Sequence, residues 1–195
     1  MKKEFRQHIE EIVTLNDDDF ERIASYFAAR RYNKGDFLFR QGDRVYYMYF
    51  VVSGLLKLVY NDESGKEHIL SFAMEDWWET DYWAYYNRST ASMSLQCLED
   101  SDILCITLSD YQELCADHPK MVSFFLQKAT FGHIASQQRI LSLLRASAQE
   151  RYEALLRRYP SLFQRVSKSL IAAYLGVSRE TLSRFLPNSG ENAKL

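Results

Sequence analysis

Apolar side chains recur at helical spacing near both ends of the chain, whereas the middle of the chain alternates as strands do. An apolar stripe from Phe20 to Phe27 predicts that residues 1 to about 30 are helical. From Gly35 to Leu108, short β-branched and aromatic runs are separated by turn residues. Many short strands at this spacing are typical of a jelly roll or barrel.

Helical periodicity returns from Asp110 to about Leu144. Pro119 suits a first helical turn, and the helix that follows it would be roughly 38 Å long, enough to join two domains. Its apolar stripe can pack on the chain's own barrel or on a partner helix, and spacing alone does not decide between them. A further helix is expected from Arg145 to Tyr159, where Pro160 ends it.

The stretch from Val166 to Phe185 predicts two helices joined by a tight turn. Ser167 and Ser178 can each cap a helix start, because a serine hydroxyl accepts a hydrogen bond from an unpaired backbone N–H. Gly176 falls where the first helix must end, and glycine enters the left-handed region at little cost. A plain helical hairpin would show the same periodicity. The spacing of small, glycine and apolar residues at 172, 176 and 182 favours a DNA-binding helix-turn-helix.

In a helix-turn-helix, the first turns of the second helix enter the major groove and read base edges. Arginine can bond guanine bidentately and glutamate can accept from cytosine N4, so Arg179, Glu180 and Arg184 are the predicted base-reading residues. The alternative is that these side chains are solvated, with Glu180 paired to Arg184 one turn further on. Serine, threonine and lysine near helix starts suit phosphate oxygens. The residues predicted to position the DNA backbone are Ser167, Lys168, Ser178, Thr181 and Ser183.

Charge is unevenly distributed along the chain. The whole sequence carries 24 basic and 26 acidic residues, a formal net charge of −2. From Arg139 to the end there are 10 basic and 4 acidic residues, whereas the preceding residues hold 14 and 22. A basic C-terminal part is what the neutralisation of DNA phosphates requires, and double-stranded DNA is therefore the expected partner.

Several other classes of protein do not fit the sequence. Cys97, Cys105 and Cys115 form no C-x-x-C pair, and the four histidines lack the spacing of metal ligands, so neither a metal nor a cofactor is expected. We find no Walker loop and no Gly-x-Ser-x-Gly element, and we expect no enzyme activity. No apolar run approaches the roughly 20 residues that cross a bilayer, and the N-terminus lacks a secretory signal. A cytoplasmic protein without a membrane partner is expected.

Two segments resemble the CRP/FNR family of bacterial transcription regulators. One comprises KGDFLFRQGD at 34–43 and YFVVSGLLKLVYNDESGKEHILSF at 49–72, and the other is SRETLSR at 178–184. The resemblance implies an α+β chain with an N-terminal double-stranded β-helix (jelly-roll) domain, a long connecting dimerisation helix and a C-terminal helix-turn-helix domain. The expected boundaries are 1–116, 117–145 and 146–195. It also implies a homodimer on DNA, with RNA polymerase as a further candidate partner.

The chain departs from the family pattern at the effector site. Members that bind cyclic nucleotides have Gly-Glu at the start of a short helix and an Arg-Ser/Thr-Ala motif about ten residues later, which hold the ribose and the cyclic phosphate. Here Glu79-Thr80 replaces Gly-Glu, Arg88 lies about three residues early, and acidic residues crowd the stretch. A cyclic nucleotide is therefore not expected. The candidate effector-pocket residues are Trp77, Trp78, Glu79, Thr80, Tyr82, Arg88 and Ser89.

Two questions remain open at the level of sequence. The aromatic residues from Trp77 to Tyr86 either line a pocket for an unknown small-molecule effector or fill the former pocket as core. The chain is either a DNA-binding regulator or a small-molecule-sensing β-roll module whose helix-turn-helix no longer binds DNA. The short tail PNSGENAKL supports the second interpretation, because its sequence is too short for the usual strands of a wing. Arg179, Glu180 and Arg184 favour the first interpretation.

Overall fold

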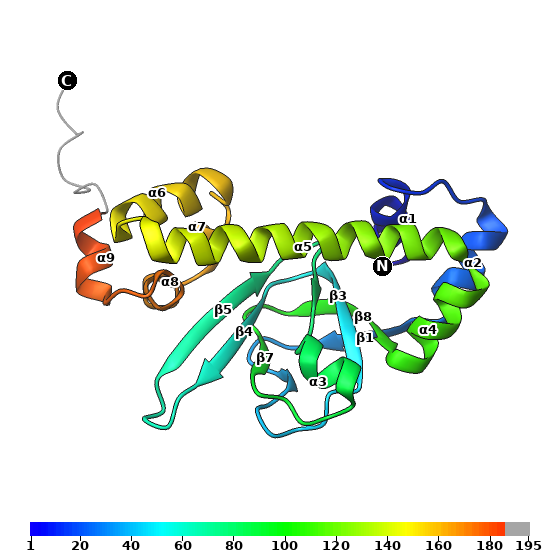
Figure 1. Ribbon diagram of the computed structural model, residues 1–195, viewed down its shortest axis with the longest axis horizontal. Coiled ribbons are helices and arrows are strands. Elements are labelled where there is room, and N and C mark those ends of the chain that lie inside the picture. Colours follow the sequence, from blue (N-terminus) through cyan, green and yellow to red (C-terminus); the bar gives the residue numbers. More distant parts are fainter. Residues whose placement is uncertain (186–195) are drawn as a thin grey trace.

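The computed structural model describes residues 1–185, in which eight strands form two antiparallel four-stranded sheets. The sheets face each other as a β-roll, and helices cover the roll at both ends (Figure 1). One sheet has the order β1 (Ala28–Tyr32), β8 (Ser101–Thr107), β3 (Tyr47–Ser53) and β6 (Trp78–Glu79). The other has the order β2 (Phe37–Phe39), β7 (Ser94–Cys97), β4 (Leu56–Asn61) and β5 (Glu67–Ala73).

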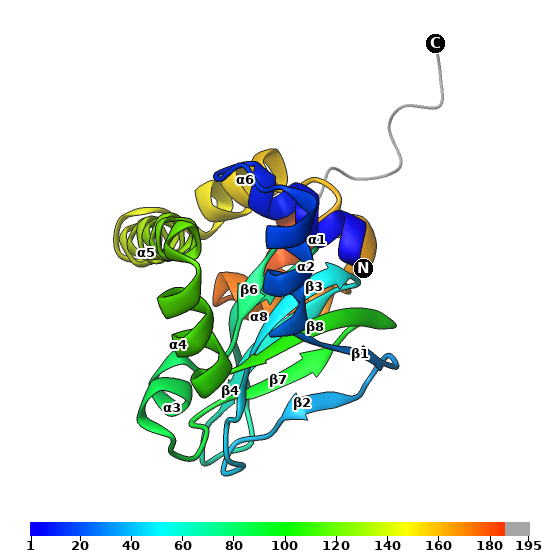
Figure 2. The ribbon, with the colours of Figure 1, turned by 90° about the vertical axis from the view of Figure 1, so that its right-hand side faces the viewer.

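The longest helix, α5, runs across the roll and connects two groups of shorter helices (Figure 1), and Figure 2 shows it end-on. Helices α1, α2 and α4 lie near its N-terminal end, and α6 to α9 lie near its C-terminal end. The N-terminal helices and the short helix within the roll are α1 (Lys2–Glu10), α2 (Asp17–Ser25), α3 (Tyr82–Asn87) and α4 (Leu108–Asp117). The others are α5 (Pro119–Arg145), α6 (Ala148–Arg158), α7 (Leu162–Arg165), α8 (Lys168–Leu175) and α9 (Arg179–Phe185). None of these described helices has the length and apolarity that a membrane span needs.

The predicted helical region over residues 1 to about 30 is present as α1 and α2 but ends earlier than predicted. The Asn16 side chain accepts a hydrogen bond from the backbone N–H of Asp19 at 2.7 Å and starts the second of these helices. Residues from Ala28 onward form β1, which pairs along its length with β8. This pairing is a tertiary interaction that helical periodicity does not reveal. The short helix α7 was not predicted, and the tail at 187–195 lies outside the described residues.

The main core lies between the two sheets and continues beneath α1 and the first turns of α5. Phe5 of α1 and Phe50 of β3 are buried and pack with ring centroids 5.3 Å apart. His8 is buried with them, and its Nε2 accepts a hydrogen bond from Trp78 Nε1 at 3.1 Å. Burial lowers the pKa of His8 to about 4, so the imidazole is neutral at physiological pH.

A second apolar core joins the roll to the C-terminal helices. Leu55, Ile69 and Phe72 of the roll are buried in it. They pack with residues of all four C-terminal helices, and the Phe72 and Tyr174 rings lie 5.2 Å apart. The C-terminal helices are therefore docked on the roll as well as being connected to it through α5.

Candidate functional site

The pair α8–α9 is built by the local signals that the sequence predicts. The hydroxyl of Ser167 accepts a hydrogen bond from the N–H of Leu170 at 3.4 Å, and that of Ser178 accepts from Thr181 at 3.1 Å. Gly176 ends α8 in the left-handed conformation, with φ of 71°. These caps fix where each helix begins, and so fix which side chains share a face.

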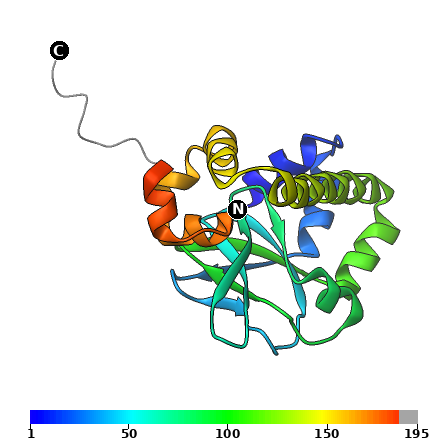
Figure 3. The ribbon, with the colours of Figure 1, turned by 60° about the vertical axis from the view of Figure 1, so that its left-hand side comes forward.

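One face of α9 is buried and the other is open to solvent. Leu182 is 1% exposed and lies in the second core, whereas Arg179, Glu180 and Arg184 are exposed. The helix lies at the outer end of the molecule, away from the roll (Figures 1 and 3). Among the described contacts there is no ion pair between Glu180 and Arg184, so both side chains are accessible to a ligand.

Most of the residues predicted to contact the DNA backbone lie at the starts of α8 and α9, and Ser183 lies one turn into α9. Ser167, Lys168 and Ser178 are exposed, and Thr181 is half-buried. The Ser178 and Thr181 hydroxyls lie 3.1 Å apart, and the exposed Ser183 hydroxyl donates to the carbonyl of Arg179 at 3.0 Å. All eight predicted DNA-contacting positions therefore belong to one small helical unit.

Only some of the basic side chains in the C-terminal part face solvent. Arg139 donates to the carbonyls of Ile69 and Tyr174, both at 3.0 Å. Arg151 donates to the carbonyl of Leu175 at 3.0 Å, and Arg165 bonds to carboxylates of the roll. These three cations hold the fold together, so the charge available to a nucleic acid is smaller than the sequence count indicates.

The candidate effector-pocket residues point in several directions. Trp77 packs edge-on against Tyr159 of the C-terminal part at 5.8 Å. Trp78 lies in the main core beside Phe50 and Phe125. Tyr82 is 45% exposed on α3. Trp77 and Trp78 therefore both pack against the main core, whereas Tyr82 lies at the surface.

The polar members of the same set are divided as well. Arg88 is exposed and ends α3 with a left-handed φ of 52°, so its guanidinium stands at the surface. The Ser89 hydroxyl is buried and has no hydrogen-bond partner in the described structure. One hollow of about 310 Å³ lies beside Gln138 and Glu150, and another of about 190 Å³ beside Leu15 and Lys120. None of the seven candidate residues lines either hollow.

Glu79 and Thr80 are buried polar residues with internal partners. Glu79 accepts a hydrogen bond from the Ser71 hydroxyl at 2.5 Å and one from the N–H of Thr80 at 3.1 Å. The Thr80 hydroxyl donates to the carbonyl of Tyr47 at 2.9 Å. Because Ser71 and Glu79 lie on strands of different sheets, this carboxyl links the two halves of the roll. Burial raises the pKa of Glu79 to about 7.

The apolar stripe of α5 is divided between the chain's own core and solvent. Met121, Phe124 and Phe125 are buried against the roll. Further along, large apolar side chains are exposed, and Leu126 and Leu144 are 66% and 79% exposed. The other exposed members after Leu126 are Phe131, Ile134, Ile140, Leu141 and Leu143.

Sequence reasoning missed the residues that connect the C-terminal helices to the roll. Arg165 contacts Glu75 and Glu99, from which it is separated by 90 and 66 residues. No motif or periodicity joins such positions. Arg165 is the last residue of the short helix α7, which the sequence analysis did not predict.

The fold is a two-sheet roll of the cyclic-nucleotide-binding type, with a long helix across it and a docked C-terminal pair of helices. Residues 29–118 match the model of the cyclic nucleotide-binding domain. Two solved structures share the fold: the c-di-GMP responsive global regulator CLP of Xanthomonas campestris and FixK2 of Bradyrhizobium japonicum. CLP has a TM-score of 0.72 and 19% identity, covering 88% of this chain and 90% of that one. FixK2 has a TM-score of 0.71 and 17% identity, covering 82% of both chains.

The curated relatives are transcription regulators. The transcriptional activator protein Anr of Pseudomonas protegens is 27% identical over 192 residues, covering 92% of this chain and 78% of that protein. The fumarate and nitrate reduction regulatory protein of Vibrio cholerae is 25% identical over 185 residues, covering 89% and 73%. The chain is similar to transcription regulators of the CRP/FNR family, the family that its sequence motifs resemble.

The raised pKa of Glu79 predicts a specific pH dependence of stability. A raised folded-state pKa means that the neutral carboxyl stabilises the fold below the unfolded pKa of roughly 4.3, and that this contribution is lost as the pH rises through about 7. Glu79→Gln removes the titration. From pH 5 to pH 8, the wild type should lose about 1–3 kcal/mol of unfolding free energy relative to the variant, as measured by urea unfolding at each pH.

Glu63→Gln is the matched control, because Glu63 lies exposed in the β4–β5 turn. This variant should follow the wild-type pH dependence. Parallel pH profiles for Glu79→Gln and the wild type would show that Glu79 does not titrate as inferred.

Proposed function

We propose that the chain is a dimeric, sequence-specific DNA-binding transcription regulator. The observation that carries the proposal is the solvent-exposed polar face of α9, held at the outer end of the molecule by a buried apolar face. A helix exposed on one side and anchored on the other can enter the major groove without loss of its own packing. The names of the curated relatives support the same function.

In this proposal, Arg179, Glu180 and Arg184 read base edges. Their spacing along α9 brings them to one side of the helix, and each can bond a base edge through a charged group. Ser167, Lys168, Ser178, Thr181 and Ser183 position the DNA backbone. The division of the chain is that expected from its motifs, with a roll at 1–116, a connecting helix at 117–145 and a DNA-binding unit at 146–195.

The exposed stripe of α5 is the proposed dimer interface. Contiguous exposed apolar side chains on a long helix are costly in water, and pairing with the same helix of a second copy would bury them. Two recognition helices related by a two-fold axis would then meet half-sites about one DNA turn, roughly 34 Å, apart.

The roll is proposed to lack a cyclic-nucleotide site. The position of the expected ribose and phosphate contacts is taken by the buried Glu79, whose partners are internal, while Arg88 stands at the surface. A cyclic phosphate would meet a carboxyl at that position without a neighbouring cation, which is unfavourable electrostatically. No effector is assigned to the roll.

The first prediction of the proposed function concerns the dimer. Leu126→Glu places a charge in the proposed interface and should convert the protein at micromolar concentration to a monomer of 22.9 kDa, as measured by light scattering. Leu70→Glu is the control, because Leu70 is exposed on β5, outside that stripe, and its variant should remain dimeric. A wild-type monomer under these conditions would contradict the proposed interface.

The second prediction concerns base reading. We would select an operator from a random duplex library with the wild-type protein and measure binding to it and to random-sequence DNA. Arg184→Ala should cost about 1–3 kcal/mol on the operator and relax preference at one base pair, because a bidentate contact is lost. Lys168→Ala should weaken binding to all sequences alike and lower the salt slope by about one.

Arg157→Ala is the charge-matched control for both variants. Arg157 is an exposed residue of α6 that lies 3.7 Å from Glu153. Its variant should leave sequence preference unchanged. Unchanged affinity of Arg184→Ala for both kinds of DNA would rule out base reading by Arg184.

The third prediction concerns the roll. Calorimetric titration with cyclic AMP and cyclic GMP should show no binding tighter than about 100 μM. Glu79→Gln should not restore binding, because loss of the negative charge supplies neither an inward-facing cation nor space. Micromolar affinity in the wild type would overturn the proposal for the roll.

A further inference from the structure

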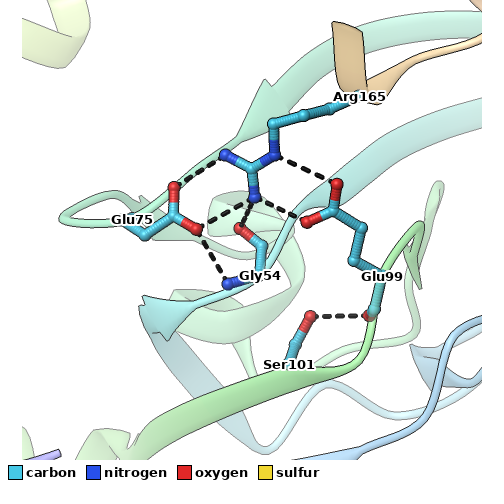
Figure 4. Close-up of polar contacts among 5 residues, drawn as sticks. All are labelled: Gly54, Glu75, Glu99, Ser101 and Arg165. Carbon is cyan, nitrogen blue, oxygen red and sulfur yellow. Dashed lines mark hydrogen bonds and ion pairs between the residues drawn. The ribbon is translucent and has the colours of Figure 1, made fainter. Parts of the chain in front are cut away.

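Arg165 binds the roll through its whole guanidinium group (Figure 4). Its Nε donates to Glu99 at 3.0 Å and its Nη1 to Glu75 at 2.8 Å. Its Nη2 lies 2.6 Å from Glu99, 2.9 Å from Glu75 and 2.9 Å from the carbonyl of Gly54. The side chain of this C-terminal residue therefore bridges three separate segments of the roll.

The acceptors on the roll are held in place independently of Arg165. Glu75 also accepts a hydrogen bond from the N–H of Gly54 at 2.9 Å, and the Ser101 hydroxyl donates to the carbonyl of Glu99 at 2.8 Å. Gly54 has a φ of 107°, and a Cβ there would lie 2.8 Å from the carbonyl oxygen of Asp100. Only glycine allows the backbone at position 54 to approach Asp100 and Ser101 so closely. This approach brings the segments that carry Glu75 and Glu99 together.

We call the contact of Arg165 with Glu75, Glu99 and Gly54 the clamp. Its opposite charges favour the bonded arrangement over separate solvation of the three charged side chains. Burial raises the pKa of Glu75, but its hydrogen bonds outweigh that effect, with the bonds from Arg165 the largest among them, and the pKa is lowered overall. The hydrogen bonds to Glu99 and Glu75 raise the pKa of Arg165. A planar guanidinium can bond two carboxylates in fixed directions, which an ammonium group cannot do. The contact therefore determines orientation as well as proximity.

Arg165 lies directly before the proposed DNA-binding pair of helices. Only Val166 separates it from Ser167, the cap of α8, so the clamp fixes the point at which α8 starts. A second anchor acts at the other end of α8, where Arg139 of α5 bonds the carbonyls of Tyr174 and Ile69. Two anchors at opposite ends of one helix prevent it from pivoting on the apolar interface.

We propose that Arg165 is a positioning residue for DNA binding, which holds α8 and α9 at a fixed angle to α5 and so sets the separation of the two recognition helices. This inference rests on the proposed function as a dimeric DNA-binding regulator. Arg165 touches no base in this scheme. Its loss should therefore relax the preference for operator geometry and leave the contacts of α9 with individual base pairs intact.

The orientation is measured directly from the distance between two spin labels in the full chain. Labels are placed at Lys34→Cys and Ser183→Cys, both exposed, in a Cys115→Ser background, and labelled protein is diluted into unlabelled protein. The wild type should give one narrow distance distribution. Arg165→Ala and the double variant Glu75→Gln/Glu99→Gln should broaden it, and Arg165→Lys should restore it only in part.

Arg157→Ala is again the control, because it removes the same charge from the same group of helices without touching the roll. It should keep the narrow distribution. Circular dichroism and thermal unfolding would identify any variant that is not folded. An unchanged narrow distribution in folded Arg165→Ala would overturn the proposed positioning role, whether or not the protein binds DNA.

The functional readout is the preference for half-site spacing. An operator selected with the wild type is compared with versions in which the half-sites are moved apart or together by one base pair. The wild type and Arg157→Ala should prefer the original spacing by about tenfold, and Arg165→Ala should reduce that preference to about threefold or less. All three proteins should bind random-sequence DNA with similar affinity.

The two readouts separate the possible failures. Retention of the full spacing preference by Arg165→Ala would overturn the positioning role while leaving DNA binding established. Failure of the wild type to bind any duplex would contradict the proposed function, and the spin-label distances would still decide whether Arg165 fixes the orientation of α9.

Discussion

The apolar interface between the roll and the C-terminal helices is the contact on which the functional arrangement depends. Leu55, Ile69 and Phe72 lie outside the core between the sheets, and burial of each large apolar side chain stabilises the docked state by about 1.5–3 kcal/mol. Such burial is not directional, so it would tolerate several orientations of the docked helices. The arginine contacts at the edges of this interface are directional, and they select one orientation. Stability and geometry are thus supplied by different interactions.

Two buried carboxyl groups of the roll, those of Glu79 and Asp81, have internal hydrogen-bond partners, whereas the buried Ser89 hydroxyl has none among the described residues. Asp81 caps α3 through the N–H of Ala84 and also accepts from the N–H and hydroxyl of Ser92. Glu79 joins the two sheets through Ser71. A ligand that needed these groups would have to displace bonds that already compensate their burial, at a cost of roughly 1–3 kcal/mol for each group left unpaired. This cost supports the proposal that the roll does not bind a cyclic nucleotide.

Sequence patterns predicted what local chemistry determines and missed what long-range contacts determine. The strands of the roll, the caps at Ser167 and Ser178 and the turn at Gly176 follow from propensity and capping, and the structure contains them. Strand β1 was missed because its partner β8 lies about 70 residues away in the chain. The DNA-contacting residues were chosen from one short motif, and their roles stay predictions. Arg165 could not have been chosen, since its importance arises from carboxylates brought together only by folding.

Several arginines of the C-terminal part bond within the chain itself, and this limits how the chain can bind a nucleic acid. Arg139, Arg151 and Arg165 bond to carbonyls and carboxylates of the chain itself, so their charges are already compensated or directed inward. The acidic excess of the preceding residues further reduces long-range attraction to a duplex. In the proposed complex with DNA, modest phosphate neutralisation would leave more of the selectivity to base edges and to the spacing of two recognition helices. A rigidly docked helical unit would supply that spacing, because a freely pivoting unit would accept many operator geometries equally.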